Sequence, residues 1–210
     1  MSDKQMNRKI LEYLKRIQAM AKTGLSYTEN PYDVERYEEM RDTTNALLAE
    51  LSNANLDQVQ FQFEQLDNDY PTPKVDVRGV VIRDHKILLI QEKSDQKWAM
   101  PGGWCDIGYS PSENIVKEVY EEAGLKVKPV RVLSVWDKAK HNHPDDLRSV
   151  YKINFLCEIV EGELNVGHEA LDGGFFGLDE LPPLSLHRNT EAQIRKLIEL
   201  AGSLGSIEYD

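Results

Sequence analysis

The sequence predicts an α/β (α+β) domain, in which helices cover a mixed sheet, preceded by a small all-helical domain. Three observations lead to this fold class. The first part of the chain repeats apolar side chains at three- and four-residue steps, which is typical of amphipathic helices. A polar segment with two prolines, residues 67–74, then has the composition of a linker. Beyond it, runs rich in Val and Ile are interrupted by helical patterns. The predicted domains are therefore residues 1–68 and 69–210.

Two helices are predicted in the N-terminal domain. The apolar stripe of the first comprises Ile10, Leu11, Leu14, Ile17, Met20 and Ala21. The second begins at Asn30 and Pro31, a capping residue followed by proline. Its stripe comprises Val34, Tyr37, Met40, Leu47, Leu48 and Leu51. A third, short segment is predicted from Leu56 to Phe63.

The first of these helices is locally basic. Its only acidic residues are Asp3 and Glu12, whereas its basic residues are Lys4, Arg8, Lys9, Lys15, Arg16 and Lys22. One interpretation is a solvated face opposite the apolar stripe. The other is contact with a phosphate-bearing substrate or with an acidic partner subunit.

The second domain begins with a predicted hairpin, Val75 to Arg83 and Lys86 to Glu92, joined by Asp84 and His85. Further strands are predicted at Val127 to Val135, Ser149 to Ile159 and Gly174 to Gly177, and a last helix at Thr190 to Ala201. The order of strands, helix, strands and helix indicates a mixed sheet with helical layers.

Composition narrows the class of protein. The formal net charge of -11 argues against general affinity for nucleic acid or for an anionic membrane, because both carry negative charge. No apolar run is long enough to span a bilayer, and the charged start of the chain lacks a signal-peptide core. The cysteines, Cys105 and Cys157, form neither a disulfide framework nor a metal-binding pair. We expect a cytoplasmic enzyme.

A short acidic helix is predicted to follow Ser110. Ser110 can serve as the N-cap, Pro111 fits the first helical position, and Glu113 completes a capping box. Gly124 suits the left-handed residue that ends a helix. The buried side of this helix would comprise Ile115, Val116, Val119, Tyr120 and Ala123.

Three glutamates crowd the end of this helix. Glu118, Glu121 and Glu122 stand at positions i, i+3 and i+4, so they lie on or near one face and repel one another. A bound Mg²⁺, which prefers oxygen ligands, would relieve that repulsion. A solvated acidic face is the alternative. The preceding glycines, Gly102 and Gly103, allow the backbone to approach a ligand closely, which favours a site for metal-bridged phosphates.

These residues resemble the signature of the Nudix hydrolases, G-x5-E-x7-R-E-U-x-E-E-x-G-U, where U is aliphatic. The frame runs over twenty-three positions through Gly103, Lys117, Glu118, Val119, Glu121, Glu122, Gly124 and Leu125. Two positions depart from it: Tyr109 replaces the first glutamate and Lys117 the arginine. Lysine supplies charge but not a planar bidentate fork. We interpret both departures as altered scaffolding, because the metal-binding carboxylates are intact.

The resemblance covers nearly the whole chain. Residues 77–104 resemble the opening strands of the Nudix fold, an α/β/α sandwich, and residues 173–185 resemble its closing segment. Residues 24–40 resemble a helical N-terminal domain found on a two-domain bacterial branch. That branch includes CDP-choline pyrophosphatases and proteins labelled ADP-ribose pyrophosphatases, and it implies a homodimer.

The resemblance implies Mg²⁺-dependent hydrolysis of a pyrophosphate bond, with Mn²⁺ as a substitute metal. Glu118 and Glu122 would be the principal metal ligands, Glu121 would share a metal or position water, and the carbonyl of Gly103 would complete the coordination. A general base would come from a later loop, where Glu169 is the first candidate and Asp172 the second.

A segment after the third predicted strand of this domain is the candidate substrate-binding region. Trp136 is predicted to stack on a base, or else to belong to the core. Lys138, Lys140, His141 and His143 are predicted to meet phosphates, and the alternative for the two histidines is that they face solvent.

The implied substrate is a nucleoside diphosphate derivative, with CDP-choline as the first candidate and ADP-ribose as the second. The end of an RNA chain is a further alternative, which the basic first helix favours and the net charge opposes. An alternative outside the enzyme class is a non-catalytic, Nudix-like sensor that binds a nucleotide and regulates a partner. The retained glutamates argue against the sensor.

Overall fold

The computed structural model describes residues 3–52, 56, 71–203 and 205–210, and the chain divides into two units, Met1–Thr72 and Pro73–Asp210. The predicted boundary, between residues 68 and 69, lies in a part of the chain outside the described residues. The predicted third segment, Leu56 to Phe63, also lies outside them except for Leu56 itself.

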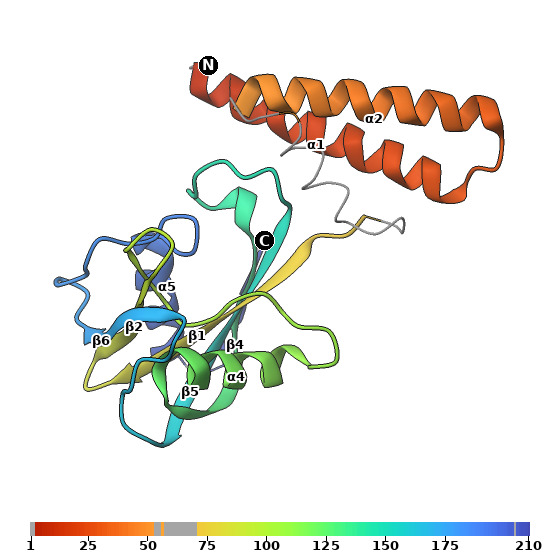
Figure 1. Ribbon diagram of the computed structural model, residues 1–210. Helices are drawn as coiled ribbons and strands as arrows, with labels where there is room; N and C mark the ends of the chain where they lie inside the picture. The colour runs from red at the N-terminus through yellow and green to blue at the C-terminus, as the bar shows by residue number, and fades with distance from the viewer. Residues whose placement is uncertain (1–2, 53–55, 57–70, 204) are drawn as a thin grey trace. The chain divides into compact units, whose positions relative to one another are not determined.

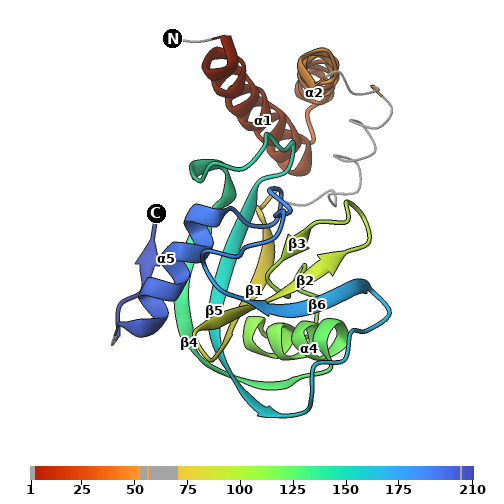
Figure 2. The same cartoon turned by 90° about the vertical axis from the view of Figure 1, so that its left-hand side faces the viewer.

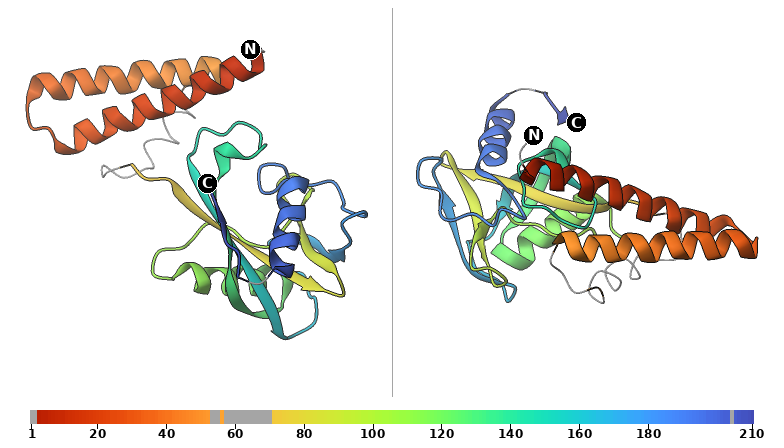
Figure 3. Two further views of the ribbon diagram at one scale, coloured as in Figure 1. Left: turned by 180° about the vertical axis from the view of Figure 1, so that it is seen from behind. Right: turned by 90° about the horizontal axis from the view of Figure 1, so that it is seen from above.

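The N-terminal unit is a hairpin of two helices, α1 (Asp3–Tyr27) and α2 (Pro31–Ser52). Figure 3 shows the two helices side by side in both views. Asn30 begins α2 as predicted, because its side-chain oxygen accepts a hydrogen bond from the backbone N–H of Tyr32 at 3.0 Å. Among the described residues of this unit, the buried apolar side chains are Leu11, Leu14, Ala21, Leu48 and Ala49.

The helical hairpin buries only part of its predicted stripes. Met20, Met40 and Leu47 remain 57%, 41% and 43% exposed. The solvated-face interpretation of the basic residues is wrong for Lys15 and Lys22, which are each only 8% exposed. Two cationic side chains of α1 are therefore buried, whereas Met20 of the same helix is exposed.

The second unit is built on one mixed sheet. Its strands are β1 (Lys74–Arg83), β2 (Lys86–Glu92), β3 (Trp98–Ala99), β4 (Lys126–Asp137), β5 (Val150–Glu161), β6 (Ala170–Phe176) and β7 (Glu208–Tyr209). Their order is β3-β2-β1-β5-β4-β7, and β6 pairs with β2. The predicted hairpin forms between β1 and β2, with Asp84 and His85 at positive φ values of 50° and 60°. Such paired values are typical of tight hairpin turns.

Helices cover the two faces of this sheet, as Figures 1 and 2 show. Helix α4 (Pro111–Ala123) packs on one face and α5 (Glu191–Gly202) belongs to the core cluster of the other. Successive side chains of β2 point to opposite faces of the sheet. Leu88 and Ile90 therefore pack on the α4 side, and Ile87 and Leu89 on the α5 side. The predicted α/β/α arrangement is confirmed.

The longer predicted elements agree with the structure to within a few residues, whereas the two-residue strands β3 and β7 were not predicted. A strand of two residues shows no alternation that a pattern could reveal. Within the described ranges, no helix combines the length and the apolar character that crossing a bilayer requires.

Candidate active site

Helix α4 begins and ends at the predicted residues. The Ser110 side chain accepts a hydrogen bond from the Glu113 backbone N–H at 3.3 Å, and the Glu113 carboxylate accepts one from the Ser110 N–H at 2.8 Å. Gly124 closes the helix at φ 67°. Gly79 of β1 lets α4 approach the sheet, because a Cβ there would lie 3.0 Å from the Val119 side chain. These contacts fix where the glutamates of α4 stand.

The glycine loop before α4 lies directly against those glutamates. A Cβ on Gly102, whose φ is 136°, would lie 2.0 Å from the carbonyl oxygen of Val77, so only glycine fits. A Cβ on Gly103 would lie 2.6 Å from Glu118 Oε2. The Gly102 N–H donates to Glu122 Oε2 at 2.9 Å. Loop and helix thus bring backbone groups and carboxylates together.

All three glutamates line one pocket of about 490 Å³. Glu122 is 8% exposed, and the side chain of Glu118 14%. Burial raises the pKa of Glu118, and it raises that of Glu122 to about 8, although Arg78 and the Gly102 N–H act in the opposite direction. Burial thus outweighs the nearby cations, and a carboxylate in that position prefers its proton. The site therefore favours any ligand that brings positive charge to α4.

Lys117 is a cation in direct contact with this group. Its Nζ lies 2.9 Å from Glu121 Oε2, 3.2 Å from Asp106 Oδ2 and 3.9 Å from Glu118 Oε1. Hydrogen bonds to Glu121 and Asp106 raise the pKa of Lys117. The lysine at the arginine position of the signature thus bridges the loop before α4 to the glutamates of the helix.

The donor set suits a hard divalent cation. The carboxylates of Glu118, Glu121 and Glu122 are oxygen ligands, and the Gly103 carbonyl keeps a second lone pair beside its hydrogen bond from the Val77 N–H at 2.9 Å. Within the described part of the chain, no three His, Cys, Asp or Glu side chains already meet as a finished metal site.

The raised pKa of Glu122 predicts a pH-dependent affinity for Mg²⁺. Mg²⁺ bound at Glu122 would displace a proton below pH 8, so the affinity should rise roughly tenfold per pH unit between pH 6 and 8 and level off above. Calorimetric Mg²⁺ titrations from pH 6 to 9, in buffers of different ionisation heat, measure both the affinity and the proton released. An affinity independent of pH, without proton release, would contradict this prediction.

A loop from β5 to β6 carries the predicted general base to the pocket. The Asn165 N–H donates to the Ala123 carbonyl at 2.9 Å and the Gly167 N–H to the Glu122 carbonyl at 3.1 Å, so the loop joins the end of α4. A Cβ on Gly167 would lie 1.7 Å from the Glu121 carbonyl oxygen. Glu169 follows and lines the pocket, whereas the alternative, Asp172, is not among its lining residues.

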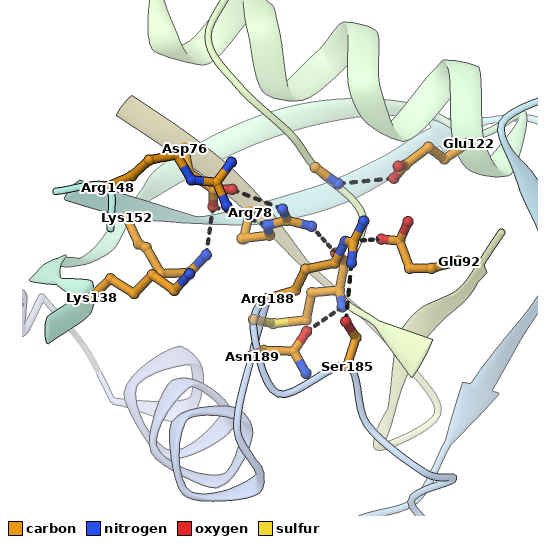
Figure 4. A network of polar contacts seen from close by, with 12 residues as sticks. Asp76, Arg78, Glu92, Glu122, Lys138, Arg148, Lys152, Ser185, Arg188 and Asn189 are labelled. Carbon is orange, nitrogen blue, oxygen red and sulfur yellow. Dashed lines mark hydrogen bonds and ion pairs between the residues drawn. The ribbon is translucent and has the colours of Figure 1, made fainter. Parts of the chain in front are cut away.

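A buried ionic network forms part of the pocket wall beside the glycine loop. Asp76 Oδ1 lies 2.7 Å from Lys152 Nζ and 3.0 Å from Arg78 Nε, and Asp76 Oδ2 lies 2.8 Å from the guanidinium of Arg78. Figure 4 shows Asp76 between these two cations. Burial alone would raise the pKa of Asp76, but Arg78 and Lys152 lower it to about 2. Burial lowers the pKa of Lys152 to about 8.

Further cations lie along the same wall. Lys138 is 6% exposed and its Nζ lies 2.6 Å from Asp146 Oδ2, while Arg148 contacts Asp146 Oδ1 at 3.0 Å. Arg188 Nε lies 2.7 Å from Glu92 Oε1. The pocket therefore combines an acidic side, formed by α4 and Glu169, with cations contributed by Arg78, Lys138, Arg148, Lys152 and Arg188.

The structure separates the predicted substrate-binding residues. Lys138 lines the pocket, but Trp136, Lys140 and His141 are not among its lining residues. The prediction that Trp136 stacks on a base is wrong, because this side chain is 2% exposed and belongs to the core cluster of α5. Its alternative placement in the core is correct.

His141 and Lys140 take other positions. His141 Nε2 lies 3.2 Å from Asp210 Oδ1, and its ring packs against Trp136 with centroids 4.7 Å apart. Lys140 is exposed at the end of a short 3-10 turn, Lys138–Lys140. Of Lys138, Lys140 and His141, only Lys138 therefore lies at the pocket.

Sequence reasoning missed most of the cationic wall. Asp76 and Arg78 lie in one predicted strand and Lys152 in another. The alternate positions of Asp76 and Arg78 were the only sign in the sequence that these charged side chains share one face. The parallel pairing of β1 and β5 sets Asp76 opposite Lys152. A register of this kind joins residues far apart in the chain, and no local pattern predicts it.

Comparison with known proteins identifies two segments. A family model described as the NUDIX domain matches residues 72–200, and one described as a UDP-X-like N-terminal oligomerisation domain matches residues 8–63. YjhB of Bacillus subtilis strain 168, which carries a provisional name as an ADP-ribose pyrophosphatase, is 43% identical over 191 residues, 91% of each chain.

Two solved structures resemble the chain. A UDP-X diphosphatase shares 34% identity with a TM-score of 0.63, and the match covers 97% of this chain and 99% of that one. An ADP-ribose pyrophosphatase from Streptococcus suis 89-1591 shares 44% identity with a TM-score of 0.59, and the match covers 66% of this chain and 98% of that one.

Proposed function

Because the chain belongs to the Nudix family of pyrophosphatases, we propose that its substrate is a nucleoside diphosphate joined to a second group. One observation carries the proposal: three glutamates of α4 and at least five cationic side chains line the same pocket. Carboxylates of this kind recruit a divalent cation, and a wall of Arg and Lys suits the anionic oxygens of two phosphoryl groups.

The residues take the following proposed roles. Glu118 and Glu122 hold the metal together with the Gly103 carbonyl, and Glu121 shares a metal or positions water. When bound, Mg²⁺ or Mn²⁺ supplies positive charge to the phosphate oxygens and lowers the pKa of coordinated water. Glu169, at the pocket and at the end of the loop that joins α4, takes the proton from the attacking water.

Lys138 and Lys152 contribute to binding on the opposite wall. Both are buried and line the pocket, and each is held there by an aspartate, Lys138 by Asp146 and Lys152 by Asp76. They meet phosphoryl oxygens of the bound diphosphate and orient it toward α4. Lys140 and His141, away from the pocket, have no part in this proposal.

Three nucleoside diphosphate derivatives are candidate substrates. The sequence resemblance favours CDP-choline, which would yield CMP and phosphocholine. The names of YjhB and of the Streptococcus suis structure favour ADP-ribose, and the UDP-X diphosphatase adds UDP-linked compounds. The cationic side chains of the pocket would bind the diphosphate that all three compounds share, so they do not distinguish among the three.

A substrate panel tests the proposal. CDP-choline, ADP-ribose and a UDP-sugar are incubated with Mg²⁺, and inorganic phosphate is measured after added phosphatase, which acts on the monoester products and not on the intact diphosphates. We expect release from at least one compound and none with EDTA. Absence of release from the whole panel, with an RNA bearing a 5′-triphosphate as the only substrate cleaved, would replace this proposal with the RNA-end alternative.

We also propose that the protein is a homodimer formed through its N-terminal helices. The match to an oligomerisation domain and the exposed apolar side chains of that unit support this assembly, the largest being Tyr13, Met20, Tyr27, Tyr32, Met40 and Leu47. Two helices form only a marginal core by themselves, so an apolar surface of this kind is expected to be covered.

Removing residues 1–68 is expected to give a monomeric or aggregating protein with weakened substrate affinity. The deletion removes the surface that pairs two copies, whereas Glu118, Glu121 and Glu122 stay in place. Analytical ultracentrifugation and steady-state kinetics measure the two effects against the full chain. A truncated protein that still sediments as a dimer with an unchanged kcat/KM would contradict the proposed interface.

A further inference from the structure

Trp104 stands apart from the other residues that line the pocket. Among the described lining residues, only Trp104 and Val150 have large apolar side chains, and His187 provides the only other ring. The remaining lining residues are glycines or carry charge. A planar, weakly polar group that enters this pocket therefore has one extended apolar surface to meet.

The backbone holds Trp104 rigidly in place. Its neighbours bond to β1 on both sides: the Gly103 carbonyl accepts from the Val77 N–H at 2.9 Å, and the Cys105 N–H donates to the Val75 carbonyl at 3.0 Å. Trp104 itself pairs with Asp76 in an antiparallel bridge. Trp104 is nevertheless 41% exposed. A large aromatic side chain on a fixed backbone forms a pre-organised contact surface.

Cations already lie over the indole ring. Arg148 Cζ lies 5.3 Å and Lys74 Nζ 5.7 Å from its centroid. Lys74 is exposed and long, so it can yield the ring face to a ligand, while Asp146 holds Arg148 beside the ring. Positive charge beside an aromatic surface suits a nucleotide, whose base stacks on the ring while its phosphate meets the cations.

We propose that Trp104 is the stacking surface for the base of the nucleotide substrate. The inference rests on the proposed function, because it assumes a nucleoside diphosphate in this pocket. Trp104 directly follows Gly103, the proposed metal ligand. A base stacked on Trp104 would therefore lie beside the proposed metal site, where the phosphates are bound. Stacking on an indole tolerates any base, which is consistent with adenine-, uracil- and cytosine-bearing candidates.

The other tryptophans do not offer such a surface. Trp136 is buried in the core, and Trp98 packs edge-on against Phe176 with centroids 4.8 Å apart. Neither lines the pocket. Trp98→Phe therefore serves as a matched control, since it removes an indole outside the pocket and retains a ring.

Product binding tests the inference in the full chain with Mg²⁺ present. AMP, CMP and UMP are titrated beside ribose 5-phosphate, which keeps the sugar and phosphate without a base. Trp104→Leu should weaken the three nucleotides roughly ten- to a hundredfold and leave ribose 5-phosphate unchanged, whereas Trp104→Phe should retain most of the affinity. Nucleotides should also quench the fluorescence of the wild type and of Trp98→Phe, but not that of Trp104→Phe.

Two outcomes would overturn the assignment. In one, Trp104→Leu weakens nucleotides and ribose 5-phosphate equally, which would indicate a disturbed pocket. In the other, nucleotide affinity is unchanged in Trp104→Leu. Failure of the proposed function has a different signature, because the substrate panel would show no hydrolysis while base-dependent binding through Trp104 persisted.

Discussion

Glu122→Gln is expected to lower kcat by about a thousandfold while the fold persists. The glutamine keeps the size of the side chain and an oxygen for the Gly102 N–H, 2.9 Å away in the wild type. It removes one negative charge from the proposed metal site, and charge stabilisation of this kind is worth several kcal/mol in the transition state. Steady-state kinetics over a range of Mg²⁺ concentrations measures the loss.

The raised pKa of Glu122 explains why the fold should tolerate this change. With a pKa of about 8, the metal-free side chain carries a proton at neutral pH, and glutamine resembles that neutral form. Urea denaturation without metal should therefore give nearly the wild-type stability. Glu158→Gln, which removes the same charge from an exposed position of β5, is the control and should retain activity. Near-normal turnover in Glu122→Gln would exclude this glutamate from the site.

Asp76→Ala is expected to destabilise the protein by about 3–5 kcal/mol, the usual cost of leaving buried partner charges uncompensated. Arg78 is 3% and Lys152 2% exposed, and Asp76 is the carboxylate that contacts both. Without it, two buried cations lie close together with no carboxylate between them. Urea denaturation at neutral pH measures the change in the free energy of unfolding.

A surface pair provides the control for that experiment. Lys126 and Glu161 form an ion pair at 2.9 Å between exposed side chains, so Glu161→Ala should change stability by less than about 1 kcal/mol. Equal effects of Asp76→Ala and Glu161→Ala would refute the stabilising role of the network.

The dependence of stability on acidic pH is a second test of the network formed by Asp76, Arg78 and Lys152. The folded pKa of Asp76, about 2, lies below its ordinary value of 3.8, so its contribution is present above pH 4 and is lost as the pH falls toward 2. The stability of the wild type should therefore decline more steeply over this range than that of Asp76→Ala.

Local patterns predicted much of the fold and one side of the site. The capping box at Ser110 and the left-handed Gly124 bound α4, and the spacing of Glu118, Glu121 and Glu122 placed them at one pocket. These features depend on residues a few positions apart, where helix geometry alone fixes direction. The turn at Asp84 and His85 was predictable for the same reason.

The sequence by itself thus determined the helices, the longer strands, the two-domain order and the acidic side of the pocket. Only the tertiary structure decided what faces that side. The parallel register of β1 and β5 set Asp76 opposite Lys152, and the glycine loop fixed Trp104 against β1. The tertiary structure also decided that Trp136 lies in the core and that Lys138, two residues later, lies at the pocket. Local periodicity reports which face of an element is apolar, whereas the partner of each face depends on contacts between distant segments.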